Sequence, residues 1–275
     1  MAYTWGASAN DYMSVTMPHE FPSTNRSNIL VCGWFYPTAL TIGRYLIGSD
    51  NAYLRVYIAN PANDLIALQR FSGTSPYIES TGNTLVTNTW QFIAALFTCE
   101  DTTPNADLRL YRGTDSVPPA AMSYSDATGC TGTLLGGTDL VIGNQSSTGG
   151  IAFQGDIGWL AMLHDNSTNG KNLFGIETVG DLVAGNVAYI LNTLVVPMWN
   201  GTPPVHMAMD WTKNMQALFL DLSGPVPSAF CASHSNSAMT PLSITTSGPT
   251  YSAREPPTRL QYPWPVANRS PRMRI

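Results

Sequence analysis

ILVCGWFY, residues 29–36, is a continuous apolar run that ends at Pro37. β-Branched and aromatic side chains of this kind favour extended strands. Because no polar residues alternate with the apolar ones, the run predicts a strand that is covered on both faces. WQFIAALFTC, residues 90–99, repeats the pattern. We therefore expect two long strands that are buried on both sides.

Other segments alternate with a period of two. Leu54, Val56 and Ile58 are separated by Arg55 and Tyr57, which is typical of a half-buried strand. Residues 157–163 alternate in the same way, and short turn signals rich in glycine, serine, threonine and asparagine separate the segments. No helical period is found up to residue 164. This pattern predicts an antiparallel β-sandwich or barrel.

Composition limits the classes of protein. Only 11% of the 275 residues are charged, against about 25% in an average soluble protein, which argues against a disordered chain or a coiled coil. The net charge of −5 does not suit binding to nucleic acid, and no apolar run is long enough to predict a membrane span. The opening MAYTWGASANDYMSV lacks the features of a secretory signal peptide, so we expect folding in a reducing cytoplasm.

The pattern changes after residue 165. Residues 177–194 place apolar side chains at helical spacing with glycine interruptions, which predicts a short amphipathic helix. The apolar positions are Val179, Leu182, Val183, Val187, Ile190, Leu191 and Leu194. We expect three regions: a β-sandwich over residues 1–165, a helix and strands that complete or flank it over 166–251, and an extended arm over 252–275.

The four cysteines are Cys32, Cys99, Cys130 and Cys231. They are widely spaced and form no C-x-x-C motif, so a zinc site is not expected. Because Cys32 and Cys99 lie inside apolar runs, we predict that they are buried free thiols in the two sheets, with disulfide bonding as the alternative.

The end of the chain is basic. Five arginines and one acid, Glu255, lie in the last 22 residues. One interpretation is a solvated tail, and the other is an arm that lies on an acidic partner surface, for which Tyr262-Pro263-Trp264-Pro265 supplies apolar anchors. We expect residues 252–275 to be mobile in the monomer and ordered in an assembly. The residues expected to contact the partner are Arg259, Tyr262, Trp264, Arg269, Arg272 and Arg274.

A succession of short motifs covers residues 8–165. In order, they are Ser8-Ala9-Asn10-Asp11-Tyr12-Met13, Gly33-Trp34-Phe35 followed by Pro37, Thr89-Trp90-Gln91-Phe92-Ile93-Ala94, Leu108-Arg109-Leu110-Tyr111-Arg112-Gly113, Leu140-Val141-Ile142-Gly143, and Phe153-Gln154-Gly155-Asp156-Ile157-Gly158-Trp159-Leu160. The succession resembles the laminin-G-like and pentraxin-like branch of the concanavalin A-like lectin/glucanase superfamily. This resemblance implies an all-β jelly roll of two antiparallel sheets, and it implies no particular activity.

Two positions depart from that family pattern, and a later segment extends the resemblance. Arg112 stands where the family has an aspartate before glycine, and Gly158 stands where an acid often follows the closing isoleucine. Residues 221–224 (DLSG), followed by residues 248–251 (GPTY), are similar to an ending common in laminin-G-like proteins encoded by bacteriophages. This second likeness favours a viral protein.

Catalytic chemistry finds little support in the sequence. A glycosidase of this superfamily needs two carboxylates on one strand face, which an E-x-D-x-E run would supply, and no such run occurs. No G-x-S-x-G motif accompanies the histidines. We therefore name no catalytic residue. Calcium is the usual ion of the family, but Glu100, Asp101, Asp107 and Asp115 are better explained as solvated loop acids. No metal ligand and no cofactor are assigned.

Sugar binding would use an aromatic side chain that stacks on a pyranose. Trp5, Tyr77 and Trp199 are the glycan-stacking candidates because we expect them in loops, as is Trp264 of the tail. Trp34, Trp90 and Trp159 lie in strand runs and are expected in the core.

The sequence thus predicts a non-enzymatic structural protein of a phage virion, assembled in the host cytoplasm. We expect a capsid decoration protein, or otherwise a tail or fibre component. Its expected partners are the major capsid protein, other virion proteins or further copies of itself, and neither nucleic acid nor a membrane is expected. The alternative is a lectin-like module that binds a glycan, and a glycanase with unrecognised catalytic residues follows well behind.

Overall fold

A computed structural model describes the sandwich and the beginning of the C-terminal segment. The described residues are 2–6, 8–16, 26–50, 54–59, 64–69, 73–75, 77–82, 85–100, 106–117, 119–128, 139–165, 215–222, 225–233 and 236–256. The predicted helix over 177–194 lies outside these residues. In the part of the chain that is described, no helix is long and apolar enough to cross a membrane.

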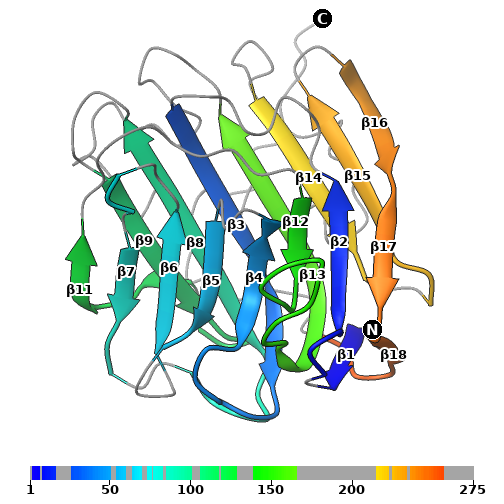
Figure 1. The fold of residues 1–275 in the computed structure, drawn as a ribbon, viewed down its shortest axis with the longest axis horizontal. Coiled ribbons are helices and arrows are strands. Elements are labelled where there is room, and N and C mark those ends of the chain that lie inside the picture. Colours follow the sequence, from blue (N-terminus) through cyan, green and yellow to red (C-terminus); the bar gives the residue numbers. More distant parts are fainter. Residues whose placement is uncertain are drawn as a thin grey trace, which may run out of the picture.

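Ten strands form the larger of two antiparallel sheets, in the order β10-β9-β8-β3-β13-β14-β15-β16, and β1 pairs with both β13 and β18 at one margin (Figure 1). The strands are β1 (Ala2–Gly6), β3 (Arg26–Pro37), β8 (Gln91–Glu100), β9 (Ala106–Gly113), β10 (Ala120–Ala121), β13 (Gln154–Asp165), β14 (Met215–Asp221), β15 (Ser228–Ser233), β16 (Asn236–Leu242) and β18 (Thr250–Ser252).

Eight strands form the second sheet, in the order β11-β7-β6-β5-β4-β12-β2-β17. They are β2 (Tyr12–Thr16), β4 (Tyr45–Ser49), β5 (Leu54–Ile58), β6 (Leu65–Gln69), β7 (Tyr77–Ser80), β11 (Tyr124–Thr128), β12 (Asp139–Ile142) and β17 (Ile244–Ser247). Neighbours that are distant in sequence, such as β17 beside β2, tie the C-terminal strands to the N-terminal ones.

The two sheets confirm the predicted all-β sandwich. The run at 29–36 lies inside β3, and the run at 90–99 coincides closely with β8, its neighbour in the sheet. β5 shows the alternation expected of a half-buried strand, with Leu54, Val56 and Ile58 buried and the two residues between them half-buried. The burial of these strands was thus correctly predicted from their hydrophobic period. The prediction was wrong for residues 157–163, which alternate in sequence, because residues 157–162 of β13 are buried on both faces.

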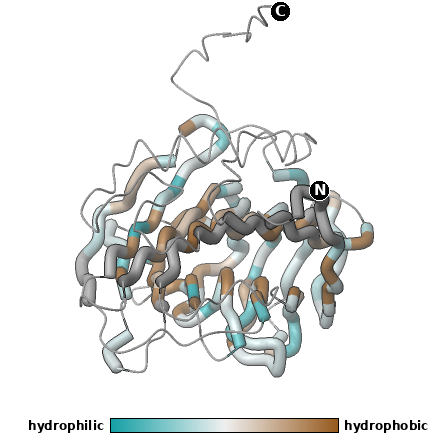
Figure 2. Tube along the Cα trace, turned by 90° about the horizontal axis from the view of Figure 1, so that it is seen from above, coloured by the Kyte–Doolittle hydropathy of each residue, from teal (hydrophilic) through white to brown (hydrophobic). Residues whose placement is uncertain are grey.

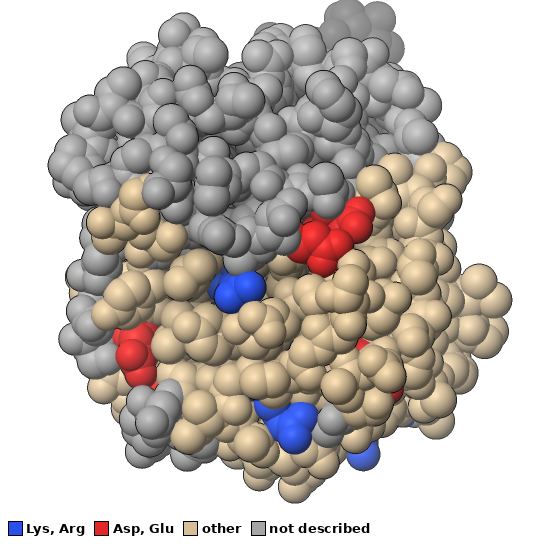
Figure 3. Space-filling model, viewed as in Figure 1, with Lys and Arg blue, Asp and Glu red and all other residues tan. Residues whose placement is uncertain are grey.

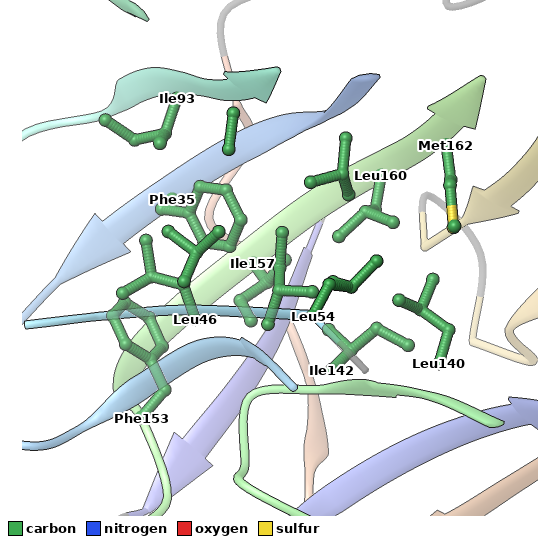
Figure 4. Packing of buried hydrophobic residues seen from close by; sticks show 14 of the residues in the cluster. Phe35, Leu46, Leu54, Ile93, Leu140, Ile142, Phe153, Ile157, Leu160 and Met162 are labelled. Atoms are coloured by element: carbon green, nitrogen blue, oxygen red, sulfur yellow. The ribbon is translucent and has the colours of Figure 1, made fainter. Parts of the chain in front are cut away.

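The main core fills the space between the sheets. Phe35, Ile157 and Leu160 of the larger sheet face Leu54 and Ile142 of the smaller one, and all five are buried (Figure 4). Viewed from above, the hydrophobic residues concentrate in the interior of the molecule (Figure 2). This continuous apolar layer holds the two sheets together.

Three of the cysteines, Cys32, Cys99 and Cys231, lie in strands of the larger sheet. Cys32 in β3 is a buried free thiol, and burial raises its pKa above the ordinary value. Cys99 is in β8 of the same sheet, so the expectation of one thiol in each sheet was wrong. Cys32 is opposite Ala94, five residues before Cys99, so at about 3.4 Å per residue the two lie too far apart for a disulfide.

Candidate functional site

A buried carboxylate marks the place where the C-terminal segment joins the sandwich. Asp156 lies in β13 opposite Tyr36 of β3 and Thr4 of β1, and its exposed fraction is 0%. The Thr4 hydroxyl donates a hydrogen bond to Oδ1, and the Arg254 guanidinium pairs with Oδ2 through Nη1. A buried charge requires such partners, because it has lost its hydration.

Arg254 makes a second contact at the same place. Its Cζ atom lies 4.0 Å from the centroid of the Tyr36 ring, which is within the range of a cation–π interaction. The Tyr36 ring in turn meets the Trp90 ring edge-on, with centroids 5.5 Å apart. The Arg254 side chain remains 42% exposed, whereas Asp156 is fully buried, so the ion pair joins a solvent-accessible cation to a buried carboxylate.

Pro256 packs beside this ion pair. It is buried, and a Cβ atom added to Gly158 would lie only 2.7 Å from its Cγ atom. The same added atom would lie 3.5 Å from Cβ of Trp34. The glycine that departs from the family pattern therefore makes room for the C-terminal segment.

The strand and turn that precede Arg254 and Pro256 position these two residues at the site. Strand β18 pairs with β1, with Thr250 opposite Thr4 and its last residue, Ser252, opposite Ala2, so the residues just after β18 begin two positions along β1 from the partner of Asp156. A turn at Gly248, with φ +86°, leads into β18, and a side chain there would collide with Asp11. Arg254 and Pro256 thus follow a short strand that is itself part of the larger sheet.

This geometry changes the limits of the predicted arm. Arg254 and Pro256 contact the sandwich of their own chain, whereas the expected mobility of residues 252–275 in the monomer stays a prediction. The arm that remains is residues 257–275. The six arm residues predicted to contact a partner, Arg259, Tyr262, Trp264, Arg269, Arg272 and Arg274, lie outside the described residues, so their role stays a prediction.

A pair of acids lies at the rim of the smaller sheet. Asp50 follows β4, and its carboxylate accepts hydrogen bonds from the Ser147 amide at 3.0 Å and hydroxyl at 2.7 Å. Asp139 begins β12 opposite Thr16. Partial burial and then the neighbouring Asp50 raise the pKa of Asp139, whereas a hydrogen bond from Thr16 opposes the shift. The two carboxyl groups can share a proton.

The rim pair is the place where hard oxygen ligands meet, and calcium prefers such ligands. It is, however, a pair: the part of the chain that is described holds no group of three or more acidic, histidine or cysteine side chains that could bind a metal. Of the acids considered from sequence, Glu100 ends β8, Asp107 lies within β9, Asp115 lies in a turn, and Asp101 is outside the described residues.

The three glycan-stacking candidates have different positions. Trp5 lies in β1 and is 1% exposed, with its ring against Gly143 in the core, so its assignment to an exposed loop was wrong. Short strands flanked by turns lack the period that would have revealed this. Tyr77 lies in β7 and is half-buried. Trp199 is outside the described residues.

Tyr77 belongs to an aromatic group on the outer face of the smaller sheet. The strand register places Arg55, Leu68 and Tyr77 in one row across β5, β6 and β7. Tyr57, Ile66 and Glu79 form the next row. Tyr45 stacks on Tyr57, with ring centroids 5.0 Å apart, and Arg55 lies over the Tyr45 ring at 5.6 Å.

The sequence analysis did not single out this group, which we name the tyrosine face: Tyr45, Arg55, Tyr57, Tyr77 and Glu79. The signal was the alternation in residues 54–58, in which the outward positions are Arg55 and Tyr57. The pKa of Tyr57 is raised by burial first and then by Tyr45. On the side of the molecule seen in Figure 3, charged groups are few and scattered among uncharged residues.

Comparisons with known proteins give structural likenesses only. No family model and no curated protein matches the chain. Domains LG4-5 of the mouse laminin alpha1 chain align with 58% of this chain at 13% identity, with a TM-score of 0.39. Full-length tailspike protein 2 of Escherichia coli O157:H7 bacteriophage CAB120 aligns with 66% of this chain at 14% identity, with a TM-score of 0.38.

This chain spans less than half of either of those chains, 41% and 24% of their respective lengths. The architecture itself is clear from the strand pairing: two antiparallel sheets are packed face to face around one apolar layer. The chain has the two-sheet antiparallel β-sandwich that its ordered motifs predict.

Proposed function

We propose that this protein is a non-enzymatic structural component of a bacteriophage virion, and more specifically a capsid decoration protein that acts through protein–protein contacts. The observation that carries the proposal is the anchor at Asp156. Arg254 and Pro256 fix the root of residues 257–275 to a rigid sheet, so the arm starts from a defined point.

The composition of the arm supports a contact with an acidic protein surface. Residues 257–275 contain four arginines and no acid, together with Tyr262 and Trp264. Arginine and aromatic residues are the side chains that most often dominate protein interfaces. A fixed root reduces the volume that the arm samples, which lowers the entropy that docking costs. The partner is the major capsid protein or a further copy of this chain.

The arrangement of carboxylates favours a binding role over glycoside hydrolysis. Retaining enzymes place two carboxyl groups about 5–5.5 Å apart, with room for the sugar. Asp50 and Asp139 are close enough to hydrogen-bond to each other, and the Asp50 carboxylate already accepts a hydrogen bond from the Ser147 hydroxyl. Asp156 is buried and neutralised by Arg254.

Truncation tests the proposal. A chain that ends at Pro256 keeps the anchor, so its thermal midpoint should stay within about 2 °C of the full chain, whereas its co-sedimentation with purified virus particles should fall at least about tenfold. Trp264→Ala should weaken particle binding in the same direction, and Val266→Ala is the matched control. If the truncated chain bound particles as well as the full chain, the hypothesis of a partner-binding arm would be wrong, and the interpretation as a solvated tail would stand.

The tyrosine face supports a second candidate function, glycan binding. Each of its two rows spans about 10 Å across two strand spacings, and the rows lie about 7 Å apart along the strands, which is wide enough for a pyranose. Tyr57→Ala should abolish retention on a glycan array. Tyr124→Ala is the matched control, because Tyr124 is 49% exposed on β11, away from the face. If the Tyr57→Ala variant binds glycans as well as the unaltered protein does, the tyrosine face is not the glycan-binding site.

A further inference from the structure

The smaller sheet ends in an open strand edge at β17. This strand pairs with β2 and has no second neighbour among the described strands, and Figure 1 shows it at the right-hand margin of the sheet. In an antiparallel pair, alternate residues turn both of their backbone groups away from the partner strand. Thr245 and Thr246, in the middle of β17, are exposed. The edge therefore presents backbone N–H and C=O groups that a further strand could bind.

The other sheet edges in the described part of the chain carry features that discourage pairing with another chain. β10 has two residues and β18 has three. β11 contains Asp126 and a register shift, and β16 contains Pro241 and a register shift against β15. Very short strands, charges, bulges and prolines all protect sheet edges from association. β17 is short, but its four residues pair with β2 in regular register and include neither a charge nor a proline.

The sequence around β17 suits a second copy of the same chain. Residues 236–253 contain no charged side chain, so no like charges meet when two copies of this edge approach each other. A two-fold axis at Thr245 places this residue opposite its own copy and Ile244 opposite Thr246. Threonine and β-branched pairs of this kind are favourable across antiparallel strands. Two antiparallel copies of one strand are self-complementary, which is what a two-fold interface requires.

We propose that two copies of this chain pair antiparallel through β17, with the two-fold axis at Thr245, so that the smaller sheet continues from one copy into the other. Two four-residue strands make a small contact compared with a standard protein interface, so the dimer is weak and reversible. The contact does not use the C-terminal arm. It also lies far along the sheet from β7 of the tyrosine face, with β6, β5, β4, β12 and β2 between them. This inference is therefore independent of both functions proposed above.

Sedimentation equilibrium of the full-length chain tests the pairing. We expect a dimer whose Kd lies below about 1 mM. Thr245→Lys sets two ammonium groups opposite each other at the axis, and Thr245→Glu sets two carboxylates there, so each variant should raise the Kd at least about tenfold. An equimolar mixture of the two variants should recover the dimer, which shows that both are folded. Ser116→Lys, in the exposed turn between β9 and β10, is the matched control and should leave the Kd unchanged.

A cysteine at the axis provides a second measurement. Directly opposite residues of antiparallel strands have Cβ atoms about 4.5–5.5 Å apart, which is near the separation in a disulfide. Thr245→Cys should therefore form a covalent dimer in oxidised glutathione, whereas Ser116→Cys should not. A chain that stays monomeric at about 1 mM would overturn the proposal. A Thr245→Lys variant that dimerises as well as the unaltered chain would also overturn it, because self-association would then use another surface.

Discussion

The two sheets differ in how many of their faces are buried. In β3 of the larger sheet, residues of both parities are buried, so the strand is apolar without interruption. In β5 of the smaller sheet, buried residues alternate with Arg55 and Tyr57, and one face stays partly open. In these two strands the hydrophobic period reports how many faces are buried, and not only the presence of a strand.

The buried outer face of the larger sheet (the closed face) and the partly exposed outer face of the smaller sheet (the open face) are suited to different roles. Side chains on the closed face of the larger sheet stabilise the fold through burial. On the tyrosine face, Tyr45 is buried, whereas the other four side chains have polar tips and are half-buried, so these four are available for binding. Substitutions at equivalent aromatic positions should separate these roles.

The largest expected effect is on the closed face. Phe92→Ala should lower the free energy of unfolding by about 3–5 kcal/mol, because it removes a buried ring and leaves a cavity between Trp34 and Trp159. Tyr57→Ala, on the open face, should cost less than about 1.5 kcal/mol. Urea unfolding measures both. Equal losses would contradict the difference in burial between the two faces.

The ion pair at the edge of the closed face should give an intermediate effect. Arg254→Ala leaves the buried Asp156 without its cation, and we expect a loss of about 2 kcal/mol, below the range for fully buried pairs because Arg254 is partly exposed. Asp156→Asn in the same chain should restore part of the loss. A double-mutant cycle checks this coupling, and simple additivity of the two substitutions would refute the anchor.

A smaller effect is expected where Pro256 meets the sheet. Gly158→Ala inserts a methyl group into the contact with Pro256 and should cost about 1 kcal/mol. Adding Pro256→Ala should recover stability, because the smaller ring-free side chain leaves space. Thermal unfolding of the single and double variants distinguishes this overlap from a general loss of glycine flexibility, which the second substitution would not rescue.

The smallest effect concerns the rim of the open sheet. The pKa of Asp139 is raised in the fold, so its protonated form is favoured there, and the associated stability is present in acid and lost as pH rises through the raised pKa. Asp139→Asn removes the repulsion with Asp50 and should stabilise the protein at pH 7 by less than about 1 kcal/mol. The gain should vanish near pH 3. Stability curves at the two pH values measure it, and a gain that persists at pH 3 would contradict the cause.

Much of the sandwich could be predicted from the sequence because its signals are local. The runs at 29–36 and 90–99 and the alternation in residues 54–58 each correspond to a strand of the expected type. The ordered motifs gave the fold for the same reason: each is a strand with its own turn.

The sites could not be predicted in this way. Asp156 and Arg254 are 98 residues apart and meet only because β18 pairs with β1. Asp50 and Ser147 are 97 residues apart and meet because β4 and β12 are neighbours. Trp5 was misplaced because five residues of strand give too short a pattern to tell which way a ring points. Pairing across the sheets, and not residue type, decides these contacts.

The pairing of β1 with β18 has a consequence for topology. Ala2 lies directly opposite Ser252, so the two ends of the sandwich meet at one edge of the larger sheet (Figure 1). A short linker could join these two ends, and new termini could be placed in a distant loop without disrupting the strand pairing of either sheet. A protein domain fused before Ala2 would lie beside the root of the arm, so the fused domain and the arm would compete for the same space. In a circularly permuted chain, the fused domain would instead lie at the opposite rim.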